Sequence, residues 1–246
     1  MSLILEVKNA TKQFAGLMAN EDISFNVETG TIVGVVGPNG AGKTTLFNSI
    51  SGAHKLTYGS IIFDGIDITA KRANQICKLG VGRTFQIPQS LNDMTVYENV
   101  LVGSLCRYSD IFTARKATEE ILEICGITNN KDSLVKNMNV IQKKRIEIAR
   151  ALATKPKLLL LDEAMAGLTN KERQDAVELI RIINKMGITI LTIEHVMDVV
   201  MNVSDKVVVI NSGKLLVEGT PEEITNNEEV ISAYLGEAKD VKRKKS

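Results

Sequence analysis

The first third of the chain has the pattern of short strands that lead into a glycine-rich turn. Residues 3–9 and 22–27 alternate apolar and polar positions, which predicts an antiparallel pair of strands. Residues 31–36 form an apolar, β-branched run of strand length, and residues 43–50 have the pattern of the first turns of a helix. Another short strand is predicted at 60–63, where the turn pair Asp64-Gly65 ends it.

The middle of the chain changes to helical spacing, and the last third alternates strands with helices. Thr95 is expected to cap a helix, with Glu98 in the capping-box position. Further helices are predicted over 113–125, ending at Gly126, and over 142–153, ending before Pro156. Strands are then predicted at 157–161, 188–193, 206–210 and 214–218, with helices at 171–186 and 196–202. This alternation predicts an α/β fold with a mostly parallel sheet that is covered on both faces.

Composition narrows the class of protein. With 246 residues, 44% apolar content and a net charge of +1, the chain is typical of a globular protein without a broad nucleic-acid surface. We expect no signal peptide, because residues 1–6 become charged at once, and no apolar run approaches the roughly 20 residues that cross a bilayer. The three cysteines lack metal-ligand spacing and are expected to be reduced thiols.

Residues 37–45 are the first candidate site. They match the phosphate-loop pattern G-x-x-x-x-G-K-S/T between a predicted strand and a predicted helix, a setting that a chance glycine-rich turn would lack. Backbone N–H groups at the start of the helix would bind phosphates, Lys43 would reach the β- and γ-phosphates, and the Thr44 hydroxyl would contact Mg²⁺. The residues expected to bind a nucleoside triphosphate are Gly37, Pro38, Asn39, Gly40, Ala41, Gly42, Lys43, Thr44 and Thr45.

Two further candidates follow predicted buried strands. Asp162 and Glu163 end the strand at 157–161, at the sheet edge where a phosphate-loop enzyme binds its ligand. Asp162 is predicted to hold magnesium and Glu163 to activate water, although a helix cap with an acidic first turn is the structural alternative. His195 follows the strand at 188–193 and is predicted to contact the γ-phosphate. A lone histidine also has a purely structural alternative.

Together these motifs identify a resemblance. From about residue 3 to 236 the chain resembles the ATP-binding subunits of ABC transporters, and among them most closely those of branched-chain amino acid importers. Besides the phosphate loop and the acidic pair, the stretches that carry the resemblance are Gly82-Arg83-Thr84-Phe85-Gln86, Met94-Thr95-Val96-Tyr97-Glu98-Asn99, Glu147-Ile148-Ala149-Arg150-Ala151-Leu152 and Ala233-Tyr234-Leu235-Gly236-Glu237.

The resemblance implies a fold, a division of the chain and further roles. The fold would be a P-loop NTPase of the ABC ATPase type, with a RecA-like core, a mostly parallel sheet, N-terminal antiparallel strands and a helical subdomain. Residues 1–236 would form one ABC ATPase domain with the helical subdomain at about 87–152, and 237–246 a basic, solvated tail whose alternative is a weak attraction to anionic lipid. Phe14 would stack on adenine, with a core phenylalanine as the alternative. Gln86 would contact magnesium and the attacking water, and 166–169 would be the D-loop.

The chain departs from the family pattern at the signature loop. Members carry Leu-Ser-Gly-Gly-Gln there, whereas this chain has Met138-Asn139-Val140-Ile141-Gln142. In the family this loop faces the γ-phosphate of the other subunit in a head-to-tail dimer, so Asn139, Val140, Ile141 and Gln142 would form a weakened contact, and Ile141 replaces a glycine that permits close approach. Ala164 and Thr169 are smaller departures, at positions of a usual proline and a usual aspartate or asparagine. We therefore expect a heterodimer with a second ATPase subunit in preference to a homodimer.

The resemblance predicts an ATPase of a transporter, with ATP and Mg²⁺ as cofactors. It would work at the cytoplasmic face of the cell membrane as a peripheral subunit, and membrane permease subunits would dock on the groove formed by Gln86 and the helical subdomain. Three alternatives stay open: an export ATPase of the lipopolysaccharide-export kind, a weakly hydrolysing regulatory ABC protein, and a soluble ABC protein that acts on nucleic acid. The last usually has two linked nucleotide domains or a long insertion, and this chain has neither. Small GTPases are excluded because no Asn-Lys-x-Asp base reader occurs.

Overall fold

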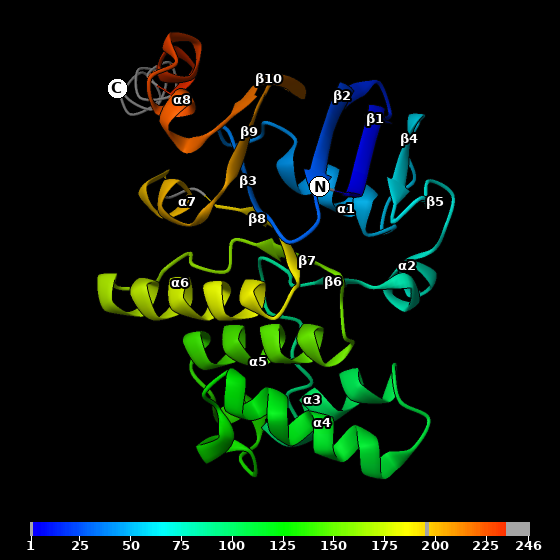
Figure 1. Ribbon diagram of the computed structural model, residues 1–246, viewed down its shortest axis with the longest axis vertical. Helices are drawn as coiled ribbons and strands as arrows, with labels where there is room; N and C mark the ends of the chain where they lie inside the picture. Colours follow the sequence, from blue (N-terminus) through cyan, green and yellow to red (C-terminus); the bar gives the residue numbers. More distant parts are fainter. Residues whose placement is uncertain (1, 195–196, 235–246) are drawn as a thin grey trace. The chain divides into compact units, whose positions relative to one another are not determined.

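The computed structural model describes residues 2–194 and 197–234 and divides into two compact units (Figure 1). The first unit comprises residues 1–73 and 189–246, and the second comprises residues 74–188. Within the described residues, none of the helices has the length and apolar character that a membrane span requires.

The first unit contains a four-stranded antiparallel sheet. Its strands are β1 (Leu3–Phe14), β2 (Leu17–Glu28), β4 (Tyr58–Phe63) and β5 (Ile66–Asp67), in the order β2-β1-β4-β5. In β2 the buried positions Ile23, Phe25 and Val27 alternate with exposed ones, as expected for a sheet with one face in the core. The predicted antiparallel pair at 3–9 and 22–27 is confirmed, and both strands are longer than the pattern indicated.

The first unit also holds a set of buried parallel strands. β3 (Ile32–Val36) lies between β8 (Thr189–Ile193) and β9 (Lys206–Asn211), and it is parallel to both. Every residue of β3 and β8 is buried, as expected for parallel strands that are covered on both faces, and neither strand contains a charged residue. Within the described residues of this unit the helices include α1 (Lys43–Ile50), α7 (Met197–Val203) and α8 (Pro221–Thr225), and residues 228–234 are also helical.

The last hairpin is antiparallel within this otherwise parallel arrangement. β10 (Lys214–Gly219) pairs with β9 through the two-residue turn Ser212-Gly213, where both residues have positive φ, 49° and 80°. Such a short turn can only join antiparallel strands, because a parallel connection needs a crossover of a dozen or more residues.

The second unit is mainly helical. It contains β6 (Val81–Arg83) parallel to β7 (Leu158–Asp162), and the helices α2 (Ala73–Leu79), α3 (Val96–Leu105), α4 (Ile111–Ile124), α5 (Val140–Ala153) and α6 (Asn170–Lys185). Short 3₁₀ turns at Thr128–Asn130 and Val135–Asn137 precede α5. Helices α3, α4 and α5 pack on one another (Figure 1). A Cβ atom at Gly103 of α3 would lie 2.3 Å from the Arg150 carbonyl oxygen, so α3 and α5 approach closely.

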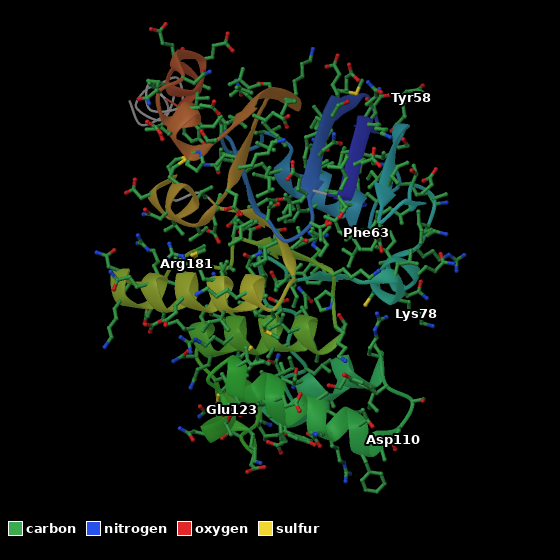
Figure 2. All side chains as sticks on the ribbon, viewed as in Figure 1. Tyr58, Phe63, Lys78, Asp110, Glu123 and Arg181 are labelled. Atoms are coloured by element: carbon green, nitrogen blue, oxygen red, sulfur yellow. The ribbon has the colours of Figure 1, made fainter. Side chains whose placement is uncertain are left out.

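The caps explain where these helices begin. Thr95 caps α3 in a complete capping box with Glu98, as predicted. α4 and α5 each begin two residues earlier than predicted, because Asp110 and Asn139 act as N-caps that the periodicity did not include. Asp110 and Glu123 mark the two ends of α4 in Figure 2. Helix α2, in which only Ile76 is buried, and the three-residue strand β6 were not predicted. The expected boundaries of the helical subdomain, 87–152, stay a prediction.

Candidate nucleotide-binding and catalytic site

The predicted phosphate loop connects β3 to α1 within the first unit. Gly42 is the N-cap of α1 in the left-handed conformation, with φ 99°, and no side chain caps this helix. Since the first N–H groups of a helix have no intrahelical partners, an end without a side-chain cap leaves them to water or to an anionic ligand. The local structure therefore has the form that phosphate binding requires.

The phosphate loop packs closely against neighbouring strands and forms hydrogen bonds with them. A Cβ atom at Gly37 would lie 1.9 Å from the Ile210 carbonyl oxygen, so no other residue fits there without a shift of backbone. The Gly213 N–H donates to the Ala41 carbonyl at 3.0 Å, and Asn20 Nδ2 donates to the Gly42 carbonyl at 3.1 Å. The strand β2 and the β9–β10 turn thus fix the path of the loop.

Lys43 places a positive charge at the loop. Its side chain is buried, and Nζ donates to the Gly37 carbonyl at 2.6 Å and to the Pro38 carbonyl at 2.8 Å. The ammonium group therefore lies over the first residues of the loop, where it would attract phosphate oxygens. Thr44, the second residue of α1, is exposed.

Phe14 lies at the end of β1 with 39% of its surface exposed. Its ring contacts His54 edge-on, with centroids 5.3 Å apart, and Lys12 Nζ lies 4.7 Å from the ring centre. An exposed aromatic ring of this kind is available for stacking, so the core alternative for Phe14 is wrong. Its role toward adenine stays a prediction.

In the second unit, the fully buried strand β7 ends at Asp162, as the apolar run predicted. Asp162 Oδ2 accepts from Arg83 Nη2 at 3.1 Å, and both side chains are almost completely buried. Burial lowers the pKa of the Arg83 guanidinium, and the Asp162 carboxylate opposes this shift. Arg83 is a site residue that sequence reasoning placed only within a motif, because nothing in the pattern showed that β6 lies beside β7.

Glu163 and Gln86 meet directly. Gln86 Nε2 donates to Glu163 Oε2 at 2.9 Å, so the structure brings together two residues that are distant in the sequence. Glu163 is buried and has a φ of 52°, a conformation that is rare for residues other than glycine. Strained backbone of this kind is frequent at functional sites.

The altered signature loop forms the N-terminus of α5. Asn139 Oδ1 accepts from the Gln142 N–H at 2.8 Å, and Gln142 Oε1 accepts from the Asn139 N–H at 3.0 Å, which completes a capping box. Val140 has 63% of its surface exposed and Ile141 is half-buried. Apolar branched side chains therefore occupy the two positions where the family pattern has glycines.

The remaining predicted positions are placed as follows. Thr169 caps α6 in a capping box with Glu172, so the D-loop ends at the start of that helix. His195 lies outside the described residues, as does the tail at 237–246. The phosphate loop belongs to the first unit, and Gln86, Asp162 and Glu163 belong to the second.

Comparisons with known proteins show which family the chain belongs to. Residues 20–166 match the ABC transporter family, and residues 214–240 match the branched-chain amino acid ATP-binding cassette transporter family. The chain is 39% identical to the high-affinity branched-chain amino acid transport ATP-binding protein BraF of Pseudomonas aeruginosa, over 96% of this chain and 98% of that protein. It is 38% identical to the probable branched-chain amino acid transport ATP-binding protein LivG of Archaeoglobus fulgidus, over 95% of each chain.

Solved structures of ATP-binding cassettes have a fold similar to that of this chain. A nucleotide-free ATP-binding cassette from an ABC transporter superposes with a TM-score of 0.86 at 33% identity, over 95% of this chain and 99% of that one. The ADP conformation of an ATP-binding cassette also gives a TM-score of 0.86, at 32% identity, over 96% of this chain and all of the other.

The phosphate loop, the acidic pair after a buried strand and the α/β fold define a P-loop ATPase. More particularly, the chain belongs to the ABC transporter family, as an ATP-binding subunit that hydrolyses ATP. The resemblance inferred from the motifs and the predicted fold class are both confirmed.

Proposed function

We propose that this chain is the ATP-hydrolysing subunit of an importer of branched-chain amino acids. The observation that carries the proposal is the similarity to branched-chain amino acid transport proteins along nearly the whole of both chains, with a second match at the C-terminal end. The relatives named above favour neither an exporter nor a regulator. The subunit would act peripherally at the cytoplasmic face of the membrane, where permease subunits form the path for the solute.

Four residues would carry out hydrolysis. Lys43 would bind the β- and γ-phosphates and His195 the γ-phosphate, while Glu163 would orient or deprotonate the attacking water. The hydrogen bond from Gln86 to Glu163 supports this role, because it keeps one lone pair of the carboxylate engaged and fixes the direction of the other oxygen. Phe14 would stack on the adenine ring.

Magnesium fits the chemistry of the proposed donors. Thr44, Gln86 and Asp162 offer hydroxyl, amide and carboxylate oxygens, which are the hard ligands that Mg²⁺ prefers. When bound, the ion would neutralise charge on the phosphates. The Arg83 guanidinium, which contacts Asp162 Oδ2 at 3.1 Å, would orient that carboxylate.

The permease would dock beside Gln86. Phe85 and Ile87, on either side of Gln86, have 42% and 74% of their surfaces exposed, and Leu91 has 40%. Exposed apolar side chains of this size in one short segment are typical of a protein interface. A short helix of a membrane partner, with apolar side chains, is the proposed occupant.

A heterodimer accounts best for the altered signature loop. The proposal rests on Ile141 in place of glycine and on Asn139, whose Oδ1 is already engaged in capping α5. This chain would contribute an intact phosphate loop and Glu163 to one site and a weakened signature loop to the other. ATP binding at both sites would still close the dimer. A homodimer would instead have two weakened sites.

Sedimentation of the Glu163→Gln protein in magnesium and ATP tests the heterodimer. Blocking hydrolysis traps any closed dimer that the chain can form. Because the altered signature loop disfavours pairing between two copies, we expect a monomer that still binds ATP. A stable homodimer would remove the main support for a second ATPase. In an assembled complex, Ile141→Gly should raise hydrolysis, because glycine would let backbone N–H groups approach the γ-phosphate, and one such donor is worth on the order of a hundredfold in rate. An unchanged rate would show that Ile141 is not limiting.

Uptake of radiolabelled leucine tests the transported solute. The chain is supplied to cells that lack their own ATPase subunit of this class, beside the Glu163→Gln variant as a matched control. Uptake that returns with the native sequence and not with the variant is expected. No uptake, together with intact hydrolysis and copurification with the permease, would contradict the choice of solute while leaving the ATPase assignment in place.

A further inference from the structure

One side of α5 carries three polar residues within its buried face. Lys144, Glu147 and Arg150 are spaced three apart, so their side chains lie on the same side of the helix. Lys144 is 9% exposed and Glu147 is 3% exposed, which is rare for charged residues unless they are paired. We call these three residues the α5 ridge.

Lys144 holds the loop that follows β7. Its Nζ donates to the Glu163 carbonyl at 2.9 Å and to the Ala166 carbonyl at 2.7 Å. The Glu163 carbonyl also accepts from the Ala166 N–H at 3.2 Å. A single ammonium group thus closes the turn 163–166, in which Glu163 adopts its positive φ.

The other two ridge residues hold the segment after Gln86. Glu147 Oε1 accepts from the Gln89 N–H at 3.3 Å, and Arg150 Nη2 donates to the Gln89 carbonyl at 2.7 Å. Both backbone groups of Gln89 are therefore bound to α5. This is three residues beyond Gln86, whose amide contacts the Glu163 carboxylate.

We propose that the α5 ridge is a common support that sets the position of Glu163 relative to Gln86, with Lys144 as its main positioning residue. The inference rests on the proposed catalytic role of Glu163. One rigid helix binds the backbone at both ends of the Gln86–Glu163 contact, so the two side chains keep their separation. The first turn of the same helix is capped by Asn139 and Gln142, so a displacement of this turn by a partner would reach Glu163 through Lys144.

Lys144→Met tests the ridge, because methionine has a similar length and no donor. Lys143→Met is the matched control, since the neighbouring Lys143 makes no side-chain contact of this kind in the described structure. Single-turnover hydrolysis is measured with the chain assembled with its partner ATPase subunit and permease, with this complex in excess over ATP. Lys144→Met should lower the maximal rate constant on the order of tenfold and leave half-saturation within about twofold, because misplaced catalytic groups slow the chemical step. Lys144→Arg, which keeps charged donors, should recover most of the rate. Equal rates for Lys144→Met and Lys143→Met would overturn the proposal.

Amide hydrogen exchange tests the same positioning role in the isolated chain, and it does not depend on the rate of ATP hydrolysis. Amides within 163–168 should exchange faster in Lys144→Met than in Lys143→Met, while the rest of the second unit stays unchanged. Faster exchange throughout the unit, or none at 163–168, would overturn the positioning role.

A double variant distinguishes failure of the positioning role of Lys144 from failure of the proposed catalytic role of Glu163. In a Glu163→Gln background, Lys144→Met should cause no further loss of rate, because Lys144 acts through Glu163. A further tenfold loss would overturn the inference alone. Full hydrolysis by Glu163→Gln would instead contradict the proposed role of Glu163.

Discussion

Two helices of this protein begin in opposite ways. α1 starts at Gly42, which has a left-handed conformation and no side-chain cap, whereas α5 starts at Asn139, which forms a complete capping box with Gln142. The first turn of α1 can offer its N–H groups to phosphate, while part of the first turn of α5 is satisfied by its own side chains. The resemblance predicts that both ends face phosphate. The difference teaches that the cap residues decide how much of a helix N-terminus the chain satisfies with its own side chains.

A glycine substitution at the start of α1 should give the largest effect. A Cβ atom in Gly42→Ala would lie 2.4 Å from the Ala19 carbonyl oxygen at a φ of 99°, so the loop must shift. We expect ATP affinity to fall on the order of a hundredfold, since strain and displacement of this kind cost about 1–3 kcal/mol. Titration with a fluorescent ATP analogue measures it.

Gly187→Ala is the matched control for this variant. Gly187 has a similar φ, 88°, and nothing lies within 4 Å of the added atom. If Gly187→Ala lowers ATP affinity as much as Gly42→Ala does, backbone conformation alone accounts for the loss, and the close approach to the Ala19 carbonyl is unimportant.

Removing the cap of α5 should have a smaller effect, and on a different property. Asn139→Ala loses the acceptor for the Gln142 N–H and should lower the free energy of unfolding by about 1 kcal/mol. ATP affinity at the chain's own phosphate loop should stay unchanged. Urea denaturation and the same ATP titration measure the two properties.

Asn137→Ala, at an exposed position in the preceding 3₁₀ turn, is the control for the cap. Loss of ATP affinity in Asn139→Ala would break the comparison, because it would show that the start of α5 influences the phosphate loop of the same chain.

Sequence reasoning found the phosphate loop and the acidic pair because each depends on local chemistry. Gly37 and Gly42 are required by backbone geometry, and Asp162 ends a continuous apolar strand, so both leave a signal in a few consecutive residues. The contacts of Arg83 with Asp162 and of Lys144 with Glu163 could not be found this way. They depend on which strands and helices become neighbours in the folded chain. Asn139 lies between these cases. Its type and its spacing to Gln142 have the form of a capping box, so the sequence carries a local signal for this cap beside the departure from the family's glycines.

Replacing Glu147, a buried carboxylate of α5, should have the smallest effect on the free energy of unfolding, and this effect should depend on pH. Burial raises the pKa of Glu147 from its ordinary value of 4.5, against the opposing influence of the Gln89 N–H and Arg150. The folded state therefore binds the proton more tightly than the unfolded state does. Stability from this group is fully present below about pH 4.5 and is lost as pH rises through the higher folded pKa.

Glu147→Gln removes this titration and keeps an oxygen that can accept from Gln89. Relative to the native sequence, the variant should gain stability as pH rises from about 4 to about 7, because it lacks the buried proton that the native folded state loses. Urea denaturation across this range measures the difference, and Glu178→Gln, at an exposed position of α6, is the control. A difference that shrinks as pH rises would show that the ion pair with Arg150 outweighs burial. The polar side of α5 would then stabilise the fold at neutral pH as well as holding the Gln89 segment.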